Sequence, residues 1–459
     1  SKLLTCFNTI RRHILLSNNI CLPHLLLTYE RHWKLPMNLY LVGGAVRDKL
    51  LGYPFTEKDW VVVGATPEEM IEQGFRQVGS DFPVFLHPKT KEEHALARTE
   101  RKSGPGYKGF QCFSDASVTL EEDLSRRDLT INAIAEDNEG NLIDPYGGQR
   151  DIANKILRHV SDAFVEDPLR VLRVARFAAR YQHLGFTIAP ETLALMTAIT
   201  SSGELQHLTP ERVWVETNKG LGERSPRTYI EVLRQCGALK VVLPEVDQLF
   251  GVAQRADYHP EIDTGIHVLM ALDQTAALDD DSAARFAVLV HDLGKGITPK
   301  DVLPKHSGHE ERGVELVNAL CDRLKAPNRH RELAVAVTRY HLLCHKAPQL
   351  RPVTILKLLK GIGALRQPEK LAQFIRCCEA DARGRMGFEN TSYDSGVWLQ
   401  QAFLAIQSID NREFIQQGLT GGKLGDAIDR RRQDVIAELK EKKLIEKKLG
   451  EKQPRENQP

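Results

Sequence analysis

The hydrophobic pattern of the chain changes near residue 160, and this change limits the possible folds more than any other sequence feature. Before it, short apolar runs at residues 39–42, 60–63, 84–86 and 131–135 alternate with helical stretches. Such alternation predicts a small sheet with helices. Beyond it, helical periodicity with intervening Pro and Gly marks residues 169–181, 210–220, 226–236, 267–278 and 283–293. We therefore predict an α+β chain, with an α/β head followed by an almost entirely helical remainder.

The length of 459 residues corresponds to about three domains at roughly 150 residues each. The predicted parts are residues 1–36 (an N-terminal extension without an assigned function), 37–160 (head), 161–255 (helical neck and body), 256–390 (a second helical domain) and 391–459 (C-terminal helices and charged tail). Met37 is a natural start for the folded part, because the preceding residues show no sustained period. From Asp429 the chain is dense in Lys, Arg and Glu, which predicts a solvated helix fraying into a disordered tail.

Charge and cysteine content narrow the class of protein. The 62 Lys and Arg residues balance 61 Asp and Glu residues, so a nucleic-acid surface would require local clustering of positive charge. The eight cysteines contain no C-x-x-C pair, which indicates reduced thiols and argues against a zinc finger. No run approaches the ~18–20 apolar residues of a membrane helix. We therefore expect a folded, cytoplasmic protein without a membrane segment.

The first candidate site begins where a strand passes through Gly43-Gly44 into a helix that carries Arg47. Backbone N–H groups at such a helix start can face a phosphate without interference from a Cβ, although a double glycine alone is more often a plain turn. Downstream, Glu57 and Asp59 lie two positions apart at the start of an apolar strand, so both carboxylates should project from one face. A pair of this kind suits Mg²⁺ bound together with substrate phosphates, although a solvated strand end shows the same pattern.

An arginine-rich helix near Pro168 supplies a second half of this site. Arg170, Arg173, Arg176 and Arg180 fall within one ~120° sector opposite an apolar face, which is also compatible with a solvated helix surface. Cytosine and adenine both present an exocyclic amine beside an unprotonated ring nitrogen. Asp167 can accept from the amine and Arg170 can donate to the ring nitrogen, and their spacing predicts that they are neighbours on the helix. For uracil or guanine both contacts would be mismatched, at ~1–3 kcal/mol each.

A second candidate site is formed by His267, the adjacent pair His291 and Asp292, and Asp381. Imidazole and carboxylate ligands together suit Ni²⁺, Mn²⁺ or Co²⁺ better than Mg²⁺ alone. A metal held in this way activates water against a phosphoester. The ligand set resembles that of the HD phosphohydrolases. His306, His309 and His341 could also line the site, but we favour structural or supporting roles for them.

Taken together, these segments resemble one family. Its motifs are Gly43-Gly44-x-Val46-Arg47-Asp48, Glu57-x-Asp59, Arg126-Arg127-Asp128-Leu129-Thr130-Ile131-Asn132-Ala133 and Glu166-Asp167-Pro168-Leu169-Arg170. They follow the order and spacing of the bacterial class II tRNA nucleotidyltransferases, the CCA-adding enzymes, which are close relatives of bacterial poly(A) polymerases. The resemblance extends from Met37 past residue 385. The family usually has Asp at the position of Glu57, whose additional methylene alters the ligand geometry.

The resemblance implies a polymerase-β-like nucleotidyltransferase head, an all-α neck and body that recognises the base, and an all-α HD domain. The implied reaction is attack by the tRNA 3′-hydroxyl on the α-phosphate of CTP or ATP, with release of pyrophosphate and with Mg²⁺ at Glu57 and Asp59. It also implies that Asp167 and Arg170 contact the base, that Arg127, Arg173 and Arg176 contact the triphosphate or ribose, and that Asp128 orients these arginines. The basic loop from Arg98 to Phe110 would move during the change from C to A addition.

For the HD domain the resemblance implies 2′,3′-cyclic phosphodiesterase, 2′-nucleotidase and phosphatase activities with Ni²⁺ or another divalent transition metal. The expected partners are tRNA, CTP and ATP, and the expected assembly is a monomer or weak homo-oligomer. Three alternatives stay open. They are a poly(A) polymerase, an HD signalling phosphohydrolase with an inactive head, and a non-enzymatic RNA-binding protein. Intact Asp59, Arg127 and Arg170 argue against the second of these.

Overall fold

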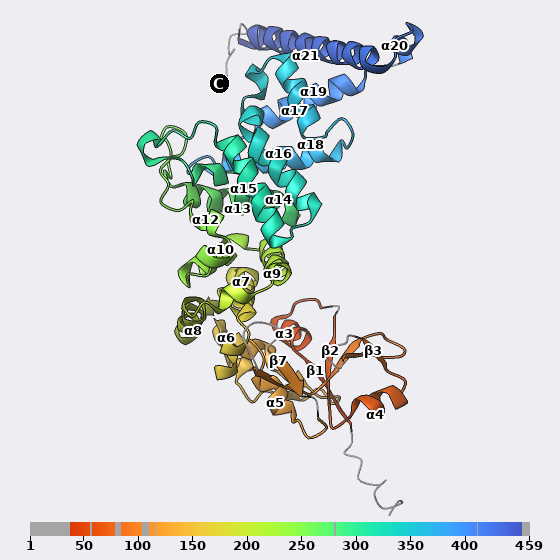
Figure 1. Ribbon diagram of the computed structural model, residues 1–459, viewed down its shortest axis with the longest axis vertical. Coiled ribbons are helices and arrows are strands. Elements are labelled where there is room, and N and C mark those ends of the chain that lie inside the picture. The colour runs from red at the N-terminus through yellow and green to blue at the C-terminus, as the bar shows by residue number, and fades with distance from the viewer. Residues whose placement is uncertain are drawn as a thin grey trace, which may run out of the picture.

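A computed structural model describes residues 37–55, 57–78, 84–102, 110–113, 115–279, 281–410 and 412–451. The molecule is elongated, with the head at one end and the last long helix lying across the other (Figure 1). The expected N-terminal extension, residues 103–109 of the basic loop and the last residues of the expected tail lie outside the described residues.

A seven-stranded mixed sheet forms the head, in the order β3-β4-β5-β2-β1-β8-β9. Its strands are β1 (Asn38–Val42), β2 (Asp59–Val63), β3 (Arg76–Val78), β4 (Val84–Leu86), β5 (Glu93–Leu96), β8 (Ala135–Glu136) and β9 (Leu142–Ile143). β2 pairs with β1 antiparallel and with β5 in parallel. The head also contains α3 (Gly44–Leu51), α4 (Pro67–Glu72), α5 (Leu120–Ser125), α6 (Gly148–Asn154) and an antiparallel pair of β6 (Thr99–Lys102) and β7 (Phe110–Phe113).

One predicted strand is wrong in most of its length. The apolar run 131–135 begins within a 3-10 turn, Thr130–Asn132, and only its last residue enters β8. The Thr130 hydroxyl donates to the buried Asp151 carboxylate over 2.7 Å, and α6 packs so closely that a Cβ on Gly148 would lie 2.2 Å from the Thr130 carbonyl. All five residues of the run are buried. Burial selects apolar residues in a turn as it does in a strand, so the run alone did not distinguish the two.

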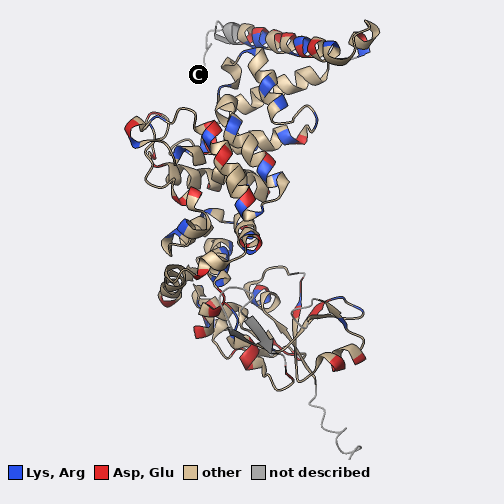
Figure 2. Ribbon diagram, in the orientation of Figure 1, with Lys and Arg blue, Asp and Glu red and all other residues tan. Residues whose placement is uncertain are grey.

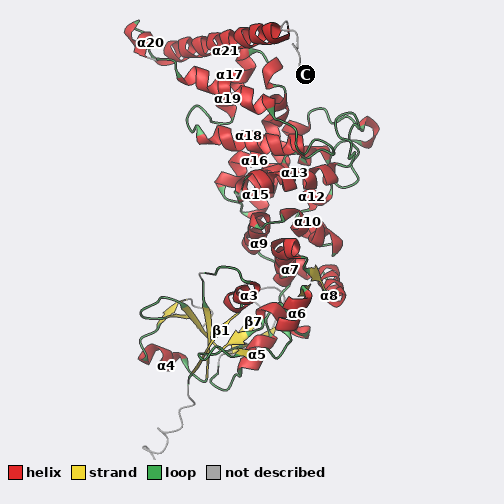
Figure 3. Cartoon of the chain, turned by 180° about the vertical axis from the view of Figure 1, so that it is seen from behind, coloured by secondary structure: helices red, strands yellow, loops and turns green. Residues whose placement is uncertain are grey.

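The rest of the described chain is helical, apart from a short parallel pair of β10 (Ile156–Leu157) and β11 (Thr187–Ile188) (Figure 3). Its helices are α7 (Leu169–Tyr181), α8 (Pro190–Ser201), α9 (Pro210–Gly222), α10 (Pro226–Gln235), α11 (Leu239–Val242), α12 (Pro244–Asp247), α13 (Thr264–Leu278), α14 (Ser282–Val290), α15 (His309–Leu324), α16 (Asn328–His345), α17 (Pro352–Gly361), α18 (Glu369–Arg383), α19 (Asp394–Gln407), α20 (Arg412–Gln416) and α21 (Gly421–Glu451). The predicted α+β class is confirmed.

Helix starts and one continuous core fix the helical part. Proline occupies the first turn of α8, α9 and α10, where its φ is already helical and its missing N–H is not needed. Asp263 and Asp281 cap α13 and α14 by accepting from Ile266 N and Ala283 N. A single cluster of buried apolar side chains extends from Leu129 through the helices to α21. The helices therefore pack as one body rather than as separate units.

The surface features are those of an ordinary globular chain. Figure 2 shows both signs of charge interspersed along α21, as expected for a solvated helix, and α21 packs on α17 and α19.

The cysteines Cys236, Cys321, Cys344, Cys377 and Cys378 are free and buried. Among the described helices, none has the length and apolarity needed to cross a bilayer.

Candidate functional site

The head and neck enclose a concavity of about 660 Å³, which we call the head pocket. All eleven head-site residues predicted from the sequence line it. They are Gly43, Gly44, Arg47, Glu57, Asp59, Arg127, Asp128, Asp167, Arg170, Arg173 and Arg176. The residues come from the β1–α3 turn and α3, from β2 and the loop before it, from the segment after α5, and from α7 and the residues just before it. The fold thus gathers four separate sequence segments around one cavity.

The carboxylates of the head pocket stand at the edge of β2. β2 begins at Asp59, so Glu57 lies in the loop before the strand rather than on its face, yet both residues are exposed and line the pocket. Partial burial raises the pKa of Asp59; the Arg127 charge lowers it and the Glu57 charge raises it, with a net upward shift. Glu57 is therefore close enough to repel Asp59 electrostatically. A cation between the two would remove that repulsion.

Glu93 is a third carboxylate that the sequence argument missed. It lies on β5 directly opposite Asp59 in the parallel pair, and it also lines the head pocket. Paired residues on neighbouring strands point to the same face of the sheet. Glu57, Asp59 and Glu93 thus line the same pocket, and carboxylate oxygens are the ligands that Mg²⁺ prefers in proteins. The only sequence signal for Glu93 would have been the alternation of β5, which is too short to recognise alone.

The Gly43-Gly44 turn takes the conformation that its glycines allow. Gly43 has φ of 68°, and a Cβ at this position would lie 3.0 Å from the Arg127 guanidinium. A side chain here would therefore crowd Arg127 and strain the backbone. Arg47, one turn into α3, is buried and donates to Asn132 over 2.6 Å and to Asp48 over 2.9 Å. Its guanidinium lies 5.1 Å from the centre of the Phe177 ring, so Arg47 also joins the head to α7.

Three arginines of the head pocket, Arg127, Arg173 and Arg176, are paired with buried carboxylates. Asp128 accepts from Arg173 over 2.7 Å and from Asn132 over 2.8 Å. Burial raises the pKa of Asp128, but the Arg173 charge and these hydrogen bonds outweigh burial and hold it well below its ordinary value. Of the three arginines that we expected Asp128 to orient, Arg173 is the one that it contacts directly. The other two have partners that the sequence argument missed.

Those partners are Asp123 for Arg127 and Glu216 for Arg176. Asp123 in α5 is fully buried and accepts from Arg127 over 3.2 Å. Glu216 in α9 is buried and accepts from Arg176 over 2.8 Å. Removing one member of a buried ion pair leaves an uncompensated charge and typically costs ~3–5 kcal/mol. These carboxylates therefore hold the arginines in place at the pocket wall.

The predicted base-reading pair is placed differently from our expectation. α7 begins at Leu169, so Asp167 has extended backbone angles and precedes the helix. Its carboxylate accepts from Leu169 N over 3.0 Å and from Arg212 of α9 over 3.0 Å. Arg170 is buried and donates to the backbone carbonyls of Ala163 and Arg126. Asp167 and Arg170 still line the same pocket, but the fold around the start of α7, not helical spacing, brings them together.

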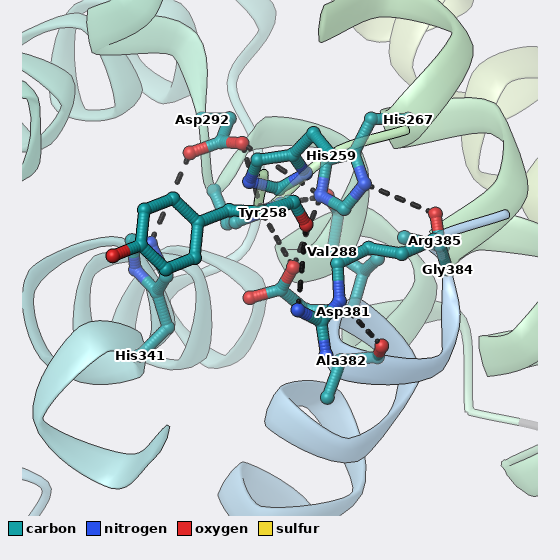
Figure 4. A network of polar contacts seen from close by, with 12 residues as sticks. Tyr258, His259, His267, Val288, Asp292, His341, Asp381, Ala382, Gly384 and Arg385 are labelled. Carbon is teal, nitrogen blue, oxygen red and sulfur yellow. Dashed lines mark hydrogen bonds and ion pairs between the residues drawn. The ribbon is translucent and has the colours of Figure 1, made fainter. Parts of the chain in front are cut away.

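A second cluster lies within the bundle of α13, α14, α16 and α18 and contains all four predicted ligands of the second site. His267 Nε2 lies 3.0 Å from Asp381 Oδ1, and His291 Nε2 lies 3.3 Å from Asp292 Oδ2 and 3.6 Å from Asp381 Oδ1. Figure 4 shows His267, Asp292 and Asp381 converging from different helices. All four side chains are buried. Residues up to 114 positions apart in the sequence, His267 and Asp381, are thus in direct contact.

The donor set and its unpaired atoms fit a divalent cation. His267, His291 and Asp381 form one group of metal-ligand size, and His291, Asp292 and His341 form an overlapping one. His291 Nε2 and Asp292 Oδ1 are buried without a hydrogen-bond partner, although buried polar atoms are nearly always satisfied. Burial lowers the pKa of His291, but the carboxylates of Asp292 and Asp381 outweigh burial and raise it to about 10. The two buried carboxylates therefore draw positive charge to this cluster, and a divalent cation bound there would take the place of the proton on His291.

Supporting residues around this cluster were partly missed. His267 Nδ1 lies 3.0 Å from the Gly384 carbonyl and 3.1 Å from Glu261 Oε1, and His345 Nε2 lies 2.8 Å from Asp381 Oδ2. A carboxylate behind a metal-binding histidine fixes the ring and its tautomer. His341 Nε2 and His309 Nε2 approach Asp292 Oδ1 to 3.9 and 3.4 Å, which is closer to the cluster than we expected for structural residues. His306 bonds Thr298 and the Ala253 carbonyl, as a structural histidine would.

The Leu-Gly-Lys sequence after Asp292 has two local functions. A Cβ on Gly294 would lie 1.9 Å from the His309 carbonyl, so only glycine lets α15 approach this turn. Lys295 is buried and donates to Asp292 Oδ2 over 2.7 Å and to Gln254 over 2.7 Å. The cluster opens into a cavity of about 610 Å³, which we call the histidine pocket. Asp292, Lys295, His309, His341 and Asp381 line it.

Three known protein families match separate segments of the chain. Residues 39–158 match the poly A polymerase head domain, residues 185–250 match a probable RNA and SrmB-binding site of polymerase A, and residues 264–365 match the HD domain. The chain is 57% identical over 404 residues to the multifunctional CCA protein of Thioalkalivibrio sulfidiphilus (strain HL-EbGR7), covering 88% of this chain and 99% of that protein.

Two solved structures share the fold. The Bacillus stearothermophilus CCA-adding enzyme in complex with CTP is 25% identical and covers 90% of this chain and 91% of its own, with a TM-score of 0.59. The Thermotoga maritima CCA-adding enzyme complexed with tRNA is 20% identical and covers 91% of this chain and 92% of its own, with a TM-score of 0.58.

Proposed function

The chain belongs to the family of multifunctional CCA proteins, and from this premise we propose that it adds and repairs the 3′-terminal CCA of tRNA, using CTP and ATP and no nucleic-acid template. The observation that carries this proposal is the convergence of all eleven predicted head-site residues on the head pocket. The lining of this pocket includes three carboxylates, Glu57, Asp59 and Glu93, and the arginines of α7. Carboxylates that can hold a cation and arginines that can hold phosphates together suit a nucleoside triphosphate.

The proposed reaction is in-line attack by the tRNA 3′-hydroxyl on the α-phosphate, which releases pyrophosphate. Glu57, Asp59 and Glu93 would hold Mg²⁺, which when bound favours the attacking alkoxide and neutralises the leaving group. Arg127, Arg173 and Arg176 would contact the triphosphate or ribose. Their partners Asp123, Asp128 and Glu216 keep each guanidinium oriented before the nucleotide arrives. Such preorganisation lowers the cost of stabilising the developing charge.

Base selection is proposed to rest on Asp167 and Arg170. A carboxylate oxygen accepts from the exocyclic amine of cytosine or adenine, and a guanidinium N–H donates to the adjacent ring nitrogen. Both side chains are already fixed by protein contacts, Asp167 by Arg212 and Arg170 by backbone carbonyls. A fixed pair reads the pattern of donor and acceptor rather than adapting to any base.

The incorporation assay that tests this proposal uses tRNA lacking its 3′ end, with labelled CTP alone, ATP alone and both together. We expect C addition, then A addition only after C, and no extension of unstructured RNA. Long A tracts on unstructured RNA would instead indicate a poly(A) polymerase. An Asp59→Asn variant should lose incorporation while its circular dichroism spectrum stays unchanged. Absence of incorporation by the natural chain would favour a signalling phosphohydrolase or an RNA-binding protein.

A second activity is supported by the unpaired buried atoms His291 Nε2 and Asp292 Oδ1. We propose that the histidine pocket holds Ni²⁺ or another divalent transition metal, which when bound activates water for phosphoester hydrolysis. The substrates would be 2′,3′-cyclic phosphates, 2′-nucleotides and related phosphomonoesters at RNA ends. Cleaning of a damaged tRNA end would then precede its extension in the head pocket.

An Asp292→Ala variant separates the two activities. We expect it to extend tRNA with an intact 3′-hydroxyl normally, but to fail on tRNA that ends in a 2′,3′-cyclic phosphate. Normal repair of the cyclic-phosphate tRNA by this variant would refute the coupling. The matched control is Asp59→Asn, which should show the reverse pattern, with hydrolysis kept and incorporation lost.

A further inference from the structure

The histidine pocket is larger than a phosphate group requires. Its volume of about 610 Å³ lies in the range of small-molecule sites, ~300–1,000 Å³. The ligand cluster with Asp292 and Asp381 forms only one part of its lining, and the rest extends over the segment before α13 and the turn after α18. A substrate that fills the pocket must therefore carry a sizeable group in addition to its phosphoester.

Two tyrosines, Tyr258 and Tyr393, line this pocket, and Tyr258 is the more exposed of the two. It lines the histidine pocket, yet 58% of its surface is exposed. Figure 4 shows its ring between Asp292 and His341, with Asp381 to one side. The backbone of Tyr258 is held from two sides, because its N–H donates to the Arg255 carbonyl over 3.1 Å and its carbonyl accepts from Arg385 over 3.4 Å. The ring is therefore presented to solvent from an anchored segment.

Cationic side chains line the histidine pocket, and one of them, Arg255, lies over the Tyr258 ring. The Arg255 guanidinium lies 5.0 Å from the centre of the Tyr258 ring, and Arg255, Lys346 and Arg385 all line the pocket. Asp394 is an acidic group on the same wall, and Asp257 pairs with Arg255 outside the lining. Three cationic side chains and one flat ring beside a metal-type cluster suit an anion that also carries a planar group.

We propose that Tyr258 is a stacking platform for a nucleobase, so that the histidine pocket selects a nucleotide at an RNA end over phosphoesters that lack a base. The base would lie on the Tyr258 ring with Arg255 beside it, while the phosphoester reaches Asp292 and Asp381. The proposal rests on the proposed hydrolytic function of this pocket for its biological meaning, but the stacking contact itself requires only binding. Aromatic stacking tolerates any base, as an end-cleaning activity on all tRNAs would need.

The test is equilibrium binding of two ligands to the full chain in the presence of Ni²⁺. One is adenosine 2′-phosphate, and the other is ribose 2-phosphate, which lacks the base. We expect Tyr258→Ala to weaken adenosine 2′-phosphate binding by about 5- to 150-fold and to leave ribose 2-phosphate unchanged. Tyr258→Phe keeps the ring and should bind like the natural chain. Nucleotide that binds at the head pocket adds the same binding signal in every variant, because Tyr258 does not line that pocket.

Phe388→Ala is the matched control, since Phe388 is also an exposed ring beside an arginine, Arg385, but does not line the histidine pocket. It should change neither affinity. The proposal is overturned if Tyr258→Ala weakens both ligands equally, weakens neither, or if the natural chain binds no adenosine 2′-phosphate. Hydrolysis of the same two compounds separates the hypotheses. Base-dependent binding without hydrolysis would refute the proposed hydrolytic function but support the stacking contact of Tyr258. Hydrolysis with a KM that Tyr258→Ala does not change would support the hydrolytic function but refute the stacking contact.

Discussion

Replacing Arg212 by alanine should reduce the preference of the head pocket for CTP over UTP. Arg212 donates to Asp167 Oδ2 over 3.0 Å, and Leu169 N holds the other carboxylate oxygen over 3.0 Å. Without Arg212, Asp167 keeps only the local contact and can rotate away from the base. Hydrogen bonds to charged groups contribute ~1.5–3 kcal/mol. The Arg212 and Asp167 side chains are 23% and 22% exposed, so solvent screening reduces this to about 1–2 kcal/mol.

That free energy corresponds to a roughly 5- to 30-fold loss of kcat/KM for CTP and ATP. UTP does not offer the amine that Asp167 accepts from, so its much lower kcat/KM should fall less and the CTP-to-UTP ratio should shrink. The assay is steady-state incorporation of each nucleotide into tRNA lacking its 3′ end. Arg227→Ala is the matched control, since Arg227 is a similarly paired arginine, 33% exposed, that does not line the head pocket. An equal loss for all three nucleotides would refute the reasoning, because Arg212 would then act on the triphosphate or the fold.

Three further predictions address the turn after Asp292, pH and metals. Gly294→Ala should lower the free energy of unfolding by at least ~1–3 kcal/mol, because its Cβ would clash with the His309 carbonyl. Gly425→Ala in α21, which has open space around it, should not lower it. Calorimetry measures both variants, and equal losses of stability would contradict the packing argument. The Asp128 pKa is depressed by Arg173, so its stabilising contribution is present above the ordinary value of 3.8 and is lost as the pH falls through the lower folded-state value. In unfolding titrations, the stability difference between the natural chain and Asp128→Asn should therefore shrink below pH 3.8, and growth of that difference on acidification would show the sign to be wrong. Chelation of divalent cations should stop both nucleotide incorporation and phosphoester hydrolysis. Added Mg²⁺ should then restore incorporation, and added Ni²⁺ should restore hydrolysis. Full recovery of hydrolysis with Mg²⁺ alone would exclude the proposed metal preference.

Local spacing was enough to predict which segments carry the chemistry. The arginine sector of α7 was predicted from the 100° step of a helix, and the apolar side of the same helix enters the core. Glycine at the β1–α3 turn and the His291-Asp292 pair at the end of α14 were likewise readable, because each depends on its immediate neighbours. The α+β division followed from the change of hydrophobic period, which reflects the burial of each element separately.

Partners across long separations could not be predicted in this way. Arg212 meets Asp167 over 45 positions, and Glu216 meets Arg176 over 40, and nothing near either residue marks the contact. Glu93 faces Asp59 only because β5 happens to pair with β2 in parallel. Such contacts depend on topology, that is, on which strands and helices become neighbours. A single amino-acid sequence carries no local signal for this. The same reason explains why Asp167 was placed on the helix instead of before it.

The contacts of α9 explain why the two sites share one rigid frame. On its first turns, Arg212 and Glu216 hold Asp167 and Arg176 of the head pocket. At its end, the buried Arg285 of α14 donates to the carbonyls of Leu221 and Glu223, over 2.8 Å each. α14 leads directly into His291 and Asp292, and the same apolar core surrounds both helices. A packed core resists gradual deformation. If the two pockets act in sequence as we propose, an RNA end would therefore have to travel from the histidine pocket to the head pocket, since the packed frame that carries them does not bring them together.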